Sequence, residues 1–258
     1  MRILKSAMLK QHLDSLFDEW DRDKTHRKNI HASDLLRSDN IEYDRDQRFC
    51  RRECVLKNFY EQNEVKNDKW AAKRFLNGWV LHEKWQDLFV KYSKALAVEE
   101  EIEHTDYGFK IVFTPDAIIE FLGEKYIVEI KGYKSDFVDK LREYDKPPES
   151  AHHQCNLYMA LTGIHKGIII IENKNTSTFK CWIVYYNEDM AKKYLDRIVQ
   201  IGEDIELHLE HDILPERICD SKTCERAKTC NARDACFSKS RGLKLLPREE
   251  WDMKNENT

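Results

Sequence analysis

The chain has 258 residues, of which 41% are hydrophobic and 35% are charged, a composition typical of one large globular domain with a small appendage. Its acidic and basic residues nearly cancel to a net charge of -4, which excludes a global positive field for nucleic acid, so any such binding must be local. No apolar run reaches the roughly 20 residues of a membrane span, and a cytoplasmic chain with eight cysteines favours metal ligation over disulfides.

The N-terminal part is predicted to be helical. Apolar residues at helical spacing over about the first 20 residues indicate an amphipathic helix, which we assign to an N-terminal extension. Ser33 is of the type that caps the start of a short helix. A second periodic run, from about Asn67 to Tyr92, predicts a long buried helix that carries His82.

Strand-like runs alternate with helical patterns over the rest of the chain. This order predicts an α/β fold with a central mixed sheet of about five strands flanked by helices. Strands are expected near Ala95 to Glu103, Phe109 to Phe121, Lys125 to Lys131, Gly167 to Ile171 and Phe179 to Tyr186, and helices at about Ser150 to Thr162 and Glu188 to His208.

The segment "TPDAIIEFLGEKYIVEIKGY" carries charges in strands that otherwise look buried. With a turn at Leu122 and Gly123, Asp116 lies opposite Glu129, and strand alternation brings Lys131 to the same face. Carboxylates placed face to face repel unless a cation lies between them, so the pattern indicates a divalent-metal site suited to phosphodiester hydrolysis. The alternative is an ion-pair ladder on a half-exposed hairpin.

Three motifs together resemble those of the RecB-like branch of the PD-(D/E)XK nuclease superfamily. They are "NGWVLHEKW", with His82 on the helix before the sheet, "TPDAII" followed by "VEIKGY" in the hairpin, and "HHQCNLYMA", with Gln154 and Tyr158 on the next helix. A lone helical histidine is more often not a ligand, and residues at i and i+4 often only pack together. The combination in order and spacing therefore carries the resemblance.

The resemblance implies a restriction-endonuclease-like core and a DNA nuclease that uses Mg²⁺ or Mn²⁺, an exonuclease by analogy with the family. Its substrate would be DNA that is single-stranded or has free ends. Lys131 would be the catalytic lysine, and Gln154 and Tyr158 would support the site or contact DNA. The implied metal ligands are His82, Asp116, Glu129 and the backbone carbonyl of Ile130.

Six cysteines flank this core. The chain resembles a subset of RecB-like nucleases, including the AddB nuclease domain and CRISPR-associated exonucleases, in which one cysteine before the core and three after it hold a [4Fe-4S] cluster. The spacing of the trailing cysteines departs from that pattern, and a zinc site formed by the four trailing cysteines is the alternative. We favour Cys50, Cys224, Cys230 and Cys236 as cluster ligands, with Cys54 and Cys219 in reserve.

The two remaining cysteines, Cys155 and Cys181, are expected to be buried apolar residues. DNA is expected to contact two local basic patches, "RFCRREC" and the segment from Lys222 to Arg233, which a cluster would bring together beside the active site.

The predicted organisation is a helical extension at 1–30, a nuclease core at 31–212, a cysteine-rich cluster region at 213–240 and a polar tail at 241–258. The chain is expected in the cytoplasm, or the host cytoplasm if phage-encoded, with no membrane contact and with a partner protein of a recombination, repair or CRISPR adaptation complex. Two other readings are an inactive DNA-binding or adaptor subunit with structural zinc and a restriction-type endonuclease. The intact acidic pair argues against the inactive one.

Overall fold

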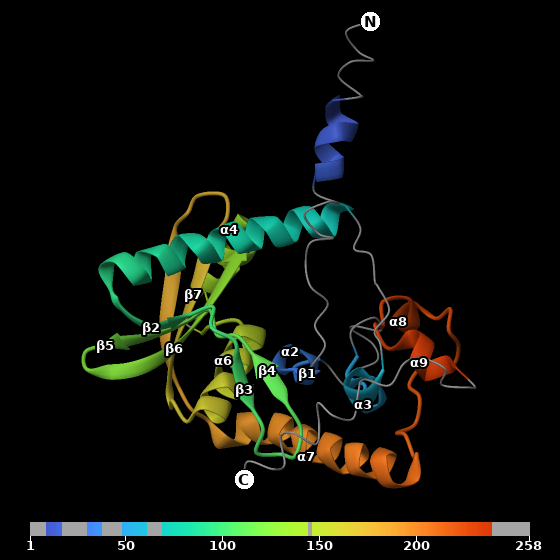
Figure 1. The fold of residues 1–258 in the computed structure, drawn as a ribbon. Coiled ribbons are helices and arrows are strands. Elements are labelled where there is room, and N and C mark those ends of the chain that lie inside the picture. The colour runs from blue at the N-terminus through green and yellow to red at the C-terminus, as the bar shows by residue number, and fades with distance from the viewer. Residues whose placement is uncertain (1–8, 17–29, 38–47, 61–68, 144–145, 239–258) are drawn as a thin grey trace, which may run out of the picture.

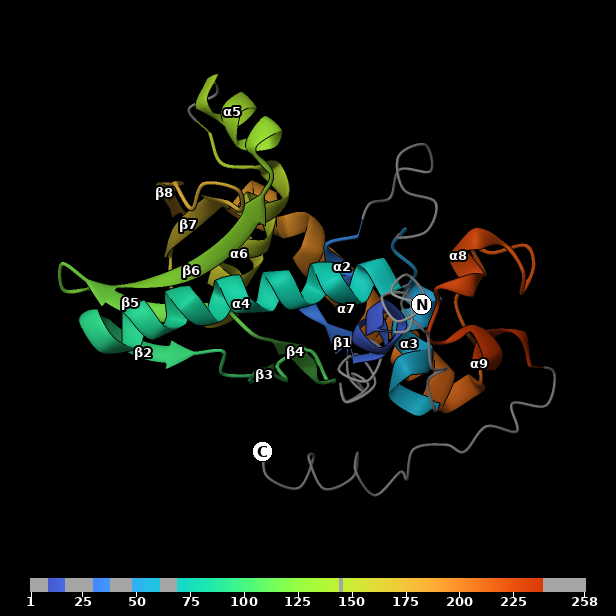
Figure 2. The ribbon, with the colours of Figure 1, turned by 90° about the horizontal axis from the view of Figure 1, so that it is seen from above.

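The computed structural model describes residues 9–16, 30–37, 48–60, 69–143 and 146–238. A mixed sheet lies at the centre, with α4 (Lys69–Tyr92) across one face and α6 (Glu149–Thr162) on the other (Figures 1 and 2). Of the predicted N-terminal extension, a helix over residues 9–16 is described. Residues 1–8 and 17–29 and the predicted tail at 241–258 lie outside the described part.

The central sheet has the strand order β2-β5-β6-β7-β8, and its one parallel pair is β6 with β7. A parallel pair needs a crossover, which α5 (Ser135–Glu143) and α6 provide. The predicted α/β class and five-stranded mixed sheet are confirmed. The strands are β2 (Lys94–Val98), β5 (Ala117–Phe121), β6 (Glu124–Tyr133), β7 (Lys166–Asn173) and β8 (Phe179–Tyr185).

The first two predicted strands were wrong in extent, because each breaks in two. Glu99 takes a left-handed conformation, with φ 47°, between β2 and β3 (Ile102–His104). Pro115, which has no N–H to donate to a ladder, separates β4 (Ile111–Phe113) from β5. The freed strands form a second sheet with β1 (Ile30–His31), in the order β1-β4-β3.

The hairpin between β5 and β6 closes through the predicted two-residue turn. Leu122 and Gly123 both have positive φ, 53° and 80°, as a type I′ turn requires. Such a turn suits the twist of the two strands and fixes their register, so its position decides which residues of β5 and β6 lie opposite each other.

The long helix α4 is half exposed, which corrects the prediction that it is buried. Leu81, Trp85 and Phe89 recur every four residues and pack on the sheet, while Phe75 and Trp79 remain exposed. The sequence places apolar residues on both sides of this helix, so composition alone overestimates its burial. None of the helices in the described ranges has both the length and the apolarity to cross a bilayer.

The short helix α2 (Ala32–Leu35) starts two residues earlier than a cap at Ser33 predicts. His31 is its N-cap, and the side chain that binds there belongs to Asp34, whose Oδ2 accepts a hydrogen bond from the His31 N–H at 3.2 Å. Ser33 lies inside the helix, so its assignment as N-cap was wrong.

The segments before and after the core meet at α3 (Arg51–Phe59). The helix packs against α7 (Glu188–His211), which also packs on α6, and against α9 (Arg233–Phe237). On α7 the buried side chain of Arg197 donates a hydrogen bond to the Arg37 carbonyl at 2.8 Å and lies 4.1 Å from the centre of the Phe49 ring. Chain segments more than 140 residues apart are thereby joined on the α7 side of the molecule.

Candidate active site and a cysteine-lined cavity

The strands β5 and β6 part at the place where the acidic motif lies. Their register pairs Ala117 with Val128, as the predicted turn requires, and β6 then continues to Tyr133 paired with β7 alone. Asp116 immediately precedes β5, and its Oδ2 accepts a hydrogen bond from the Ile130 N–H at 2.6 Å. The Ile130 N–H, which would bind a backbone carbonyl if β5 continued alongside β6, thus binds a carboxylate instead.

Asp116 is held by α4 as well as by β6. Its Oδ1 lies 3.2 Å from Nδ1 of His82, and its backbone carbonyl accepts a hydrogen bond from Gln86 Nε2 at 3.2 Å. His82 and Gln86 are one helical turn apart and therefore reach the same point of the sheet. Burial by itself would lower the pKa of His82, but the hydrogen bond and the negative charge of Asp116 raise it above its ordinary value.

Glu129 is the least satisfied charged group of the site. Its side chain is 0% exposed, and no hydrogen bond to either carboxylate oxygen is found in the described part of the chain, although Lys131 forms an ion pair with Oε1. Burial raises the pKa of Glu129 to about 7, an effect that Lys131 opposes and Asp116 reinforces. A buried carboxylate without hydrogen bonds costs free energy that a bound cation would offset.

The helix α6 covers the side of β6 on which Glu129 lies. Cys155 Sγ lies 4.0 Å from the backbone carbonyl of Ile127, two residues before Glu129, and burial together with the Glu129 charge raises the pKa of its thiol. Gln154 Nε2 donates a hydrogen bond to the Tyr158 hydroxyl at 3.1 Å. Tyr158 is 4% exposed and its ring stacks on Phe113 of β4, with ring centres 5.3 Å apart, so it belongs to the core.

The donor set at the parting of the strands suits a hard divalent cation. Two carboxylates and one imidazole converge there, and the Ile130 carbonyl faces the same side as the N–H that binds Asp116, because both groups of a strand residue point to one neighbour. Oxygen-rich sets of this kind bind Mg²⁺ and Mn²⁺. Within the described ranges no three His, Cys, Asp or Glu side chains already share one coordination point, so binding requires side chains to rotate.

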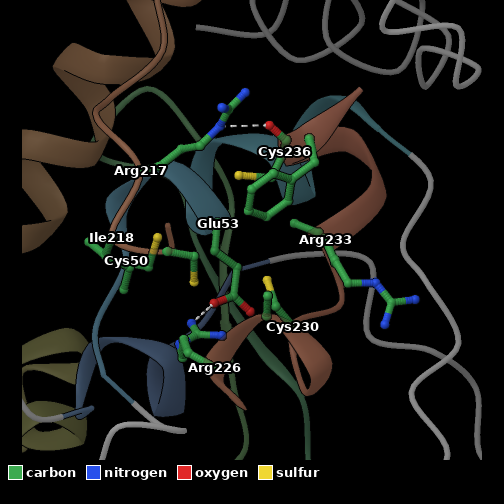
Figure 3. A pocket seen from close by; sticks show the side chains of 12 residues that line it. Cys50, Glu53, Arg217, Ile218, Arg226, Cys230, Arg233 and Cys236 are labelled. Carbon is green, nitrogen blue, oxygen red and sulfur yellow. Dashed lines mark hydrogen bonds and ion pairs between the residues drawn. The ribbon is translucent and has the colours of Figure 1, made fainter. Parts of the chain in front are cut away.

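A second candidate site is a cavity between α3 and the segment that follows α7 (Figure 3). Its volume is about 20 Å³, the space of one ion or one water molecule. Within the described ranges no three of the lining cysteines already share one coordination point, so a zinc ion and a four-iron cluster alike require the thiols to turn. The four cysteines that line the cavity are Cys50, Cys219, Cys230 and Cys236.

Cys219, which was held in reserve, lines the cavity, whereas the favoured Cys224 does not, and the choice of ligand stays a prediction. The Cys224 Sγ accepts a hydrogen bond from the Ala227 N–H at 3.4 Å, beside Cys219 and behind the cavity wall. Cys54 is buried in the core. The uneven spacing of the trailing cysteines gave no means of choosing between Cys219 and Cys224, because the choice depends on how the chain turns after Ile218.

Burial in the cavity favours the protonated form of three of its thiols. Burial raises the pKa of Cys50, and it raises the pKa values of Cys219 and Cys230 to about 12. A cation that binds there must displace these protons, which couples its affinity to pH. The cavity wall also contains an ion pair between Glu53 and Arg226 (Figure 3).

That ion pair belongs to a buried network that joins α2, α3 and α8 (Glu225–Lys228). Lys57 Nζ lies 3.0 Å from Asp34 Oδ1 and 3.6 Å from Glu53 Oε1, and Arg37 lies 2.8 Å from Glu53 Oε2. Burial would raise the pKa of Glu53, but the surrounding cations, Lys57 first, lower it below its ordinary value. Glu53 therefore stays ionised, and its ion pair with Arg226 links α3 to α8 on opposite sides of the cavity.

The prediction about the last two cysteines needs correction, and the structure also bears on the basic patches. Cys155 is buried as expected, but Cys181 is exposed because it faces outward on the edge strand β8. The two basic segments do lie together, but several of their cations already have partners within the fold, which the sequence did not predict. Arg48 and Arg52 donate hydrogen bonds to the carbonyls of Ile218 and Pro215, Arg51 pairs with Asp204, and Lys222 pairs with Asp234.

Comparison with known proteins supports the fold alone. No protein-family model and no curated protein sequence matches this chain. The alkaline exonuclease LHK-Exo from Laribacter hongkongensis, in complex with dAMP, aligns with a TM-score of 0.51 and 15% identity, over 71% of this chain and 91% of that one.

A second structure of LHK-Exo aligns with a TM-score of 0.49 and 13% identity over the same shares. SSO0001 aligns with a TM-score of 0.47 and 18% identity, over 91% of this chain and 97% of that one. The chain thus has a fold like that of an alkaline exonuclease, at a sequence identity that leaves its chemistry to be argued from its own residues.

Proposed function

We propose that this protein is a divalent-metal-dependent DNA nuclease, acting as an exonuclease, whose active centre lies where β5 and β6 part. The observation that carries the proposal is the Glu129 carboxylate, which is fully buried next to the like charge of Asp116 and pairs with the ammonium of Lys131. A surface ion-pair ladder would leave both carboxylates hydrated, whereas here Asp116 is 8% and Glu129 0% exposed. The fold shared with the exonuclease LHK-Exo, which binds dAMP in its crystal structure, is consistent with this function.

The residues proposed to hold the cation are Asp116, Glu129, His82 and the Ile130 carbonyl. Bound there, a divalent cation would supply Lewis-acid polarisation of a phosphate oxygen. Asp116 is already oriented by the Ile130 N–H and by His82, so little conformational entropy is lost when its free oxygen lone pairs bind.

Lys131 is proposed as the catalytic lysine. In the absence of substrate its ammonium pairs with Glu129, and its side chain is 30% exposed, so the same group can reach an incoming phosphate. There its Nζ would donate hydrogen bonds to a nonbridging oxygen and offset the negative charge that develops in the transition state. Tyr158, which accepts a hydrogen bond from Gln154 and stacks on Phe113, would help to fix α6 beside β6.

The cysteine-lined cavity is proposed as a structural metal centre, a [4Fe-4S] cluster by resemblance and zinc as the alternative. Its thiolates would come from Cys50, Cys230, Cys236 and either Cys219 or Cys224. Anaerobically purified protein that is brown and contains about four iron atoms would support the cluster. Colourless protein with one zinc ion would support the alternative.

The function is tested with end-labelled linear DNA, single- and double-stranded, with free and with blocked ends. We expect Mg²⁺- or Mn²⁺-dependent release of short products from free ends, and at least a hundredfold slower hydrolysis by Asp116→Asn, in line with the loss of a metal ligand. Closed circular DNA is the control substrate. Cutting of circles would indicate an endonuclease, and absence of any hydrolysis by the metal-loaded protein would favour the inactive adaptor.

A further inference from the structure

The strand that carries Lys131 runs directly into an aromatic pair. Tyr133 follows Lys131 by two residues and therefore lies on the same face of β6. Its ring stacks on that of Phe137, in the first turn of α5, with ring centres 4.2 Å apart and an interplanar angle of 30°. We call Tyr133 and Phe137 the aromatic platform.

The platform stands at the end of the sheet and has an open side. Tyr133 packs against the core, whereas Phe137 is 40% exposed. In Figure 2 the helix α5 projects beyond the end of β6, away from the other helices. The Tyr133 face thus anchors the pair, and the exposed part of the Phe137 ring remains available for another flat group.

Hydrogen bonds fix the platform relative to the candidate active site. The Tyr133 carbonyl accepts a hydrogen bond from the Lys174 N–H at 2.8 Å. Ser135 Oγ donates to Asn173 Oδ1 at 3.2 Å, and the Ser135 N–H donates to Asn175 Oδ1 at 3.2 Å. Because β7 and the turn after it hold the start of α5 in this way, the platform is a positioned element and not a loose end.

Charge does not explain what α5 offers to a ligand. The exposed charged residues at its start are Lys134, Asp136, Asp139 and Lys140, two of each sign, so they provide no net attraction for phosphate. An exposed aromatic ring, by contrast, binds any nucleobase through its flat face, independently of sequence. A base can stack there only if it is unpaired, because a paired base already lies between its neighbours in the duplex.

We propose that the aromatic platform binds an unpaired nucleobase next to the phosphate that is cut, so that the preferred substrate is single-stranded DNA or a frayed DNA end. This inference rests on the proposed nuclease function, because the position of the platform next to Lys131 matters only if Lys131 acts on a phosphate. In it, Tyr133 positions Phe137, and Phe137 contacts the base. Stacking would place the neighbouring phosphate within reach of Lys131, two residues earlier on the same strand face.

The test is an abasic-site scan combined with variants of Phe137. Binding of a fluorescent single-stranded oligonucleotide is measured in EDTA, so that no hydrolysis takes place, with an abasic site moved one nucleotide at a time from either end. We expect one position at which the abasic site weakens binding by wild-type protein roughly 5- to 100-fold. In Phe137→Ala the intact oligonucleotide should bind correspondingly less tightly, and the same abasic site should change binding by less than about twofold.

Two further variants separate stacking from packing. Phe137→Trp should keep both the affinity and the abasic effect, and Phe137→Leu, which retains apolar volume, should lose both. Tyr92→Ala, at an exposed aromatic residue on α4, is the matched control and should bind like the wild type. Thermal melting confirms that each variant is folded, which is expected because Phe137 lies outside the buried core and is 40% exposed.

Equal sensitivity to the abasic site in wild-type and Phe137→Ala protein, or tighter binding of blunt duplex than of single strand, would overturn the platform. Because the scan is done without metal, it is independent of hydrolysis. If Phe137 is coupled to one base but the protein cuts no DNA, the base-binding role is supported and the nuclease function is contradicted. If the protein cuts DNA with metal but shows no such coupling, the nuclease function is supported and the base-binding role is contradicted.

Discussion

At the scale of single residues, the site is defined by two neighbouring carboxylates, one of which is fully buried. Glu129 pairs with the Lys131 ammonium, while Asp116 receives a hydrogen bond from a backbone N–H and faces His82. Two neighbouring carboxyl groups therefore have different environments, and the one in the drier place has its pKa raised to about 7.

This difference predicts how metal binding depends on pH. Below pH 7 the raised pKa keeps Glu129 protonated, and a cation must displace that proton as well as the proton of His82, whose pKa is also raised. Affinity for Mn²⁺ should therefore fall at least roughly tenfold for each pH unit below about 7, and it should level off only where both groups are deprotonated. The rise in melting temperature caused by Mn²⁺, measured from pH 5.5 to pH 8.5, reports this directly.

Glu129→Gln is the control for this measurement, since its amide cannot be deprotonated. The variant should show little Mn²⁺-dependent stabilisation at any pH between 5.5 and 8.5. A wild-type protein whose stabilisation by Mn²⁺ is the same at pH 6 and pH 8 would contradict the role given to Glu129.

At the scale of elements, the β5–β6 hairpin brings the acidic pair together. The sequence predicted its register from the turn position, because a two-residue turn leaves no freedom in the pairing that follows. It did not predict that β5 starts only at Ala117, so that the rest of β6, up to Tyr133, is paired with β7 and not with β5. Pro115 was visible in the sequence, but the effect of its missing N–H depends on whether a neighbouring strand needs it.

The turn itself gives a test at this scale. Leu122 is 83% exposed and has φ 53°, a conformation that asparagine adopts at lower cost in a type I′ turn. Leu122→Asn should raise the free energy of unfolding by roughly 0.5 to 1 kcal/mol, measured by urea denaturation.

Gly123→Ala is the matched change in the opposite direction. An added Cβ would meet nothing within 4 Å, so any loss comes from the backbone, which at φ 80° disfavours a side chain. Unfolding free energy should fall by roughly 1 kcal/mol or more. Equal stability of the two variants would mean that this turn conformation does not form in solution.

At the scale of the whole molecule, the chain closes on itself around α3. Sequence spacing predicted that cysteines from both ends of the core come together, and Cys50, Cys230 and Cys236 do line one cavity. It did not predict Cys219 in the cavity, the exposed Cys181 or the engaged arginines of the basic segments, because these depend on long-range packing. Likewise, no sequence motif indicated the aromatic platform, and the helix α5 was not predicted.

The cavity predicts a loss of stability when its ligands are removed. Cys230→Ser should leave the purified protein without its iron or zinc and lower the free energy of unfolding by more than about 3 kcal/mol, because metal binding contributes to folding. The exposed Cys181→Ser should retain the metal and change stability by less than about 0.5 kcal/mol. Metal analysis and denaturation of both variants check this, and a metal-free wild type with unchanged stability in Cys230→Ser would exclude a structural centre.

The most direct test of the nuclease assignment measures binding and hydrolysis on the same samples. Mn²⁺ binding is followed by calorimetry at pH 8, and single-turnover hydrolysis by end-labelled linear DNA, for wild type, Lys131→Gln and Glu129→Gln. The wild type should bind and cut, Lys131→Gln should bind but cut at least a hundredfold more slowly, and Glu129→Gln should do neither. Hydrolysis by Glu129→Gln at the wild-type rate, or a wild type that binds Mn²⁺ but cuts no DNA, would contradict the assignment.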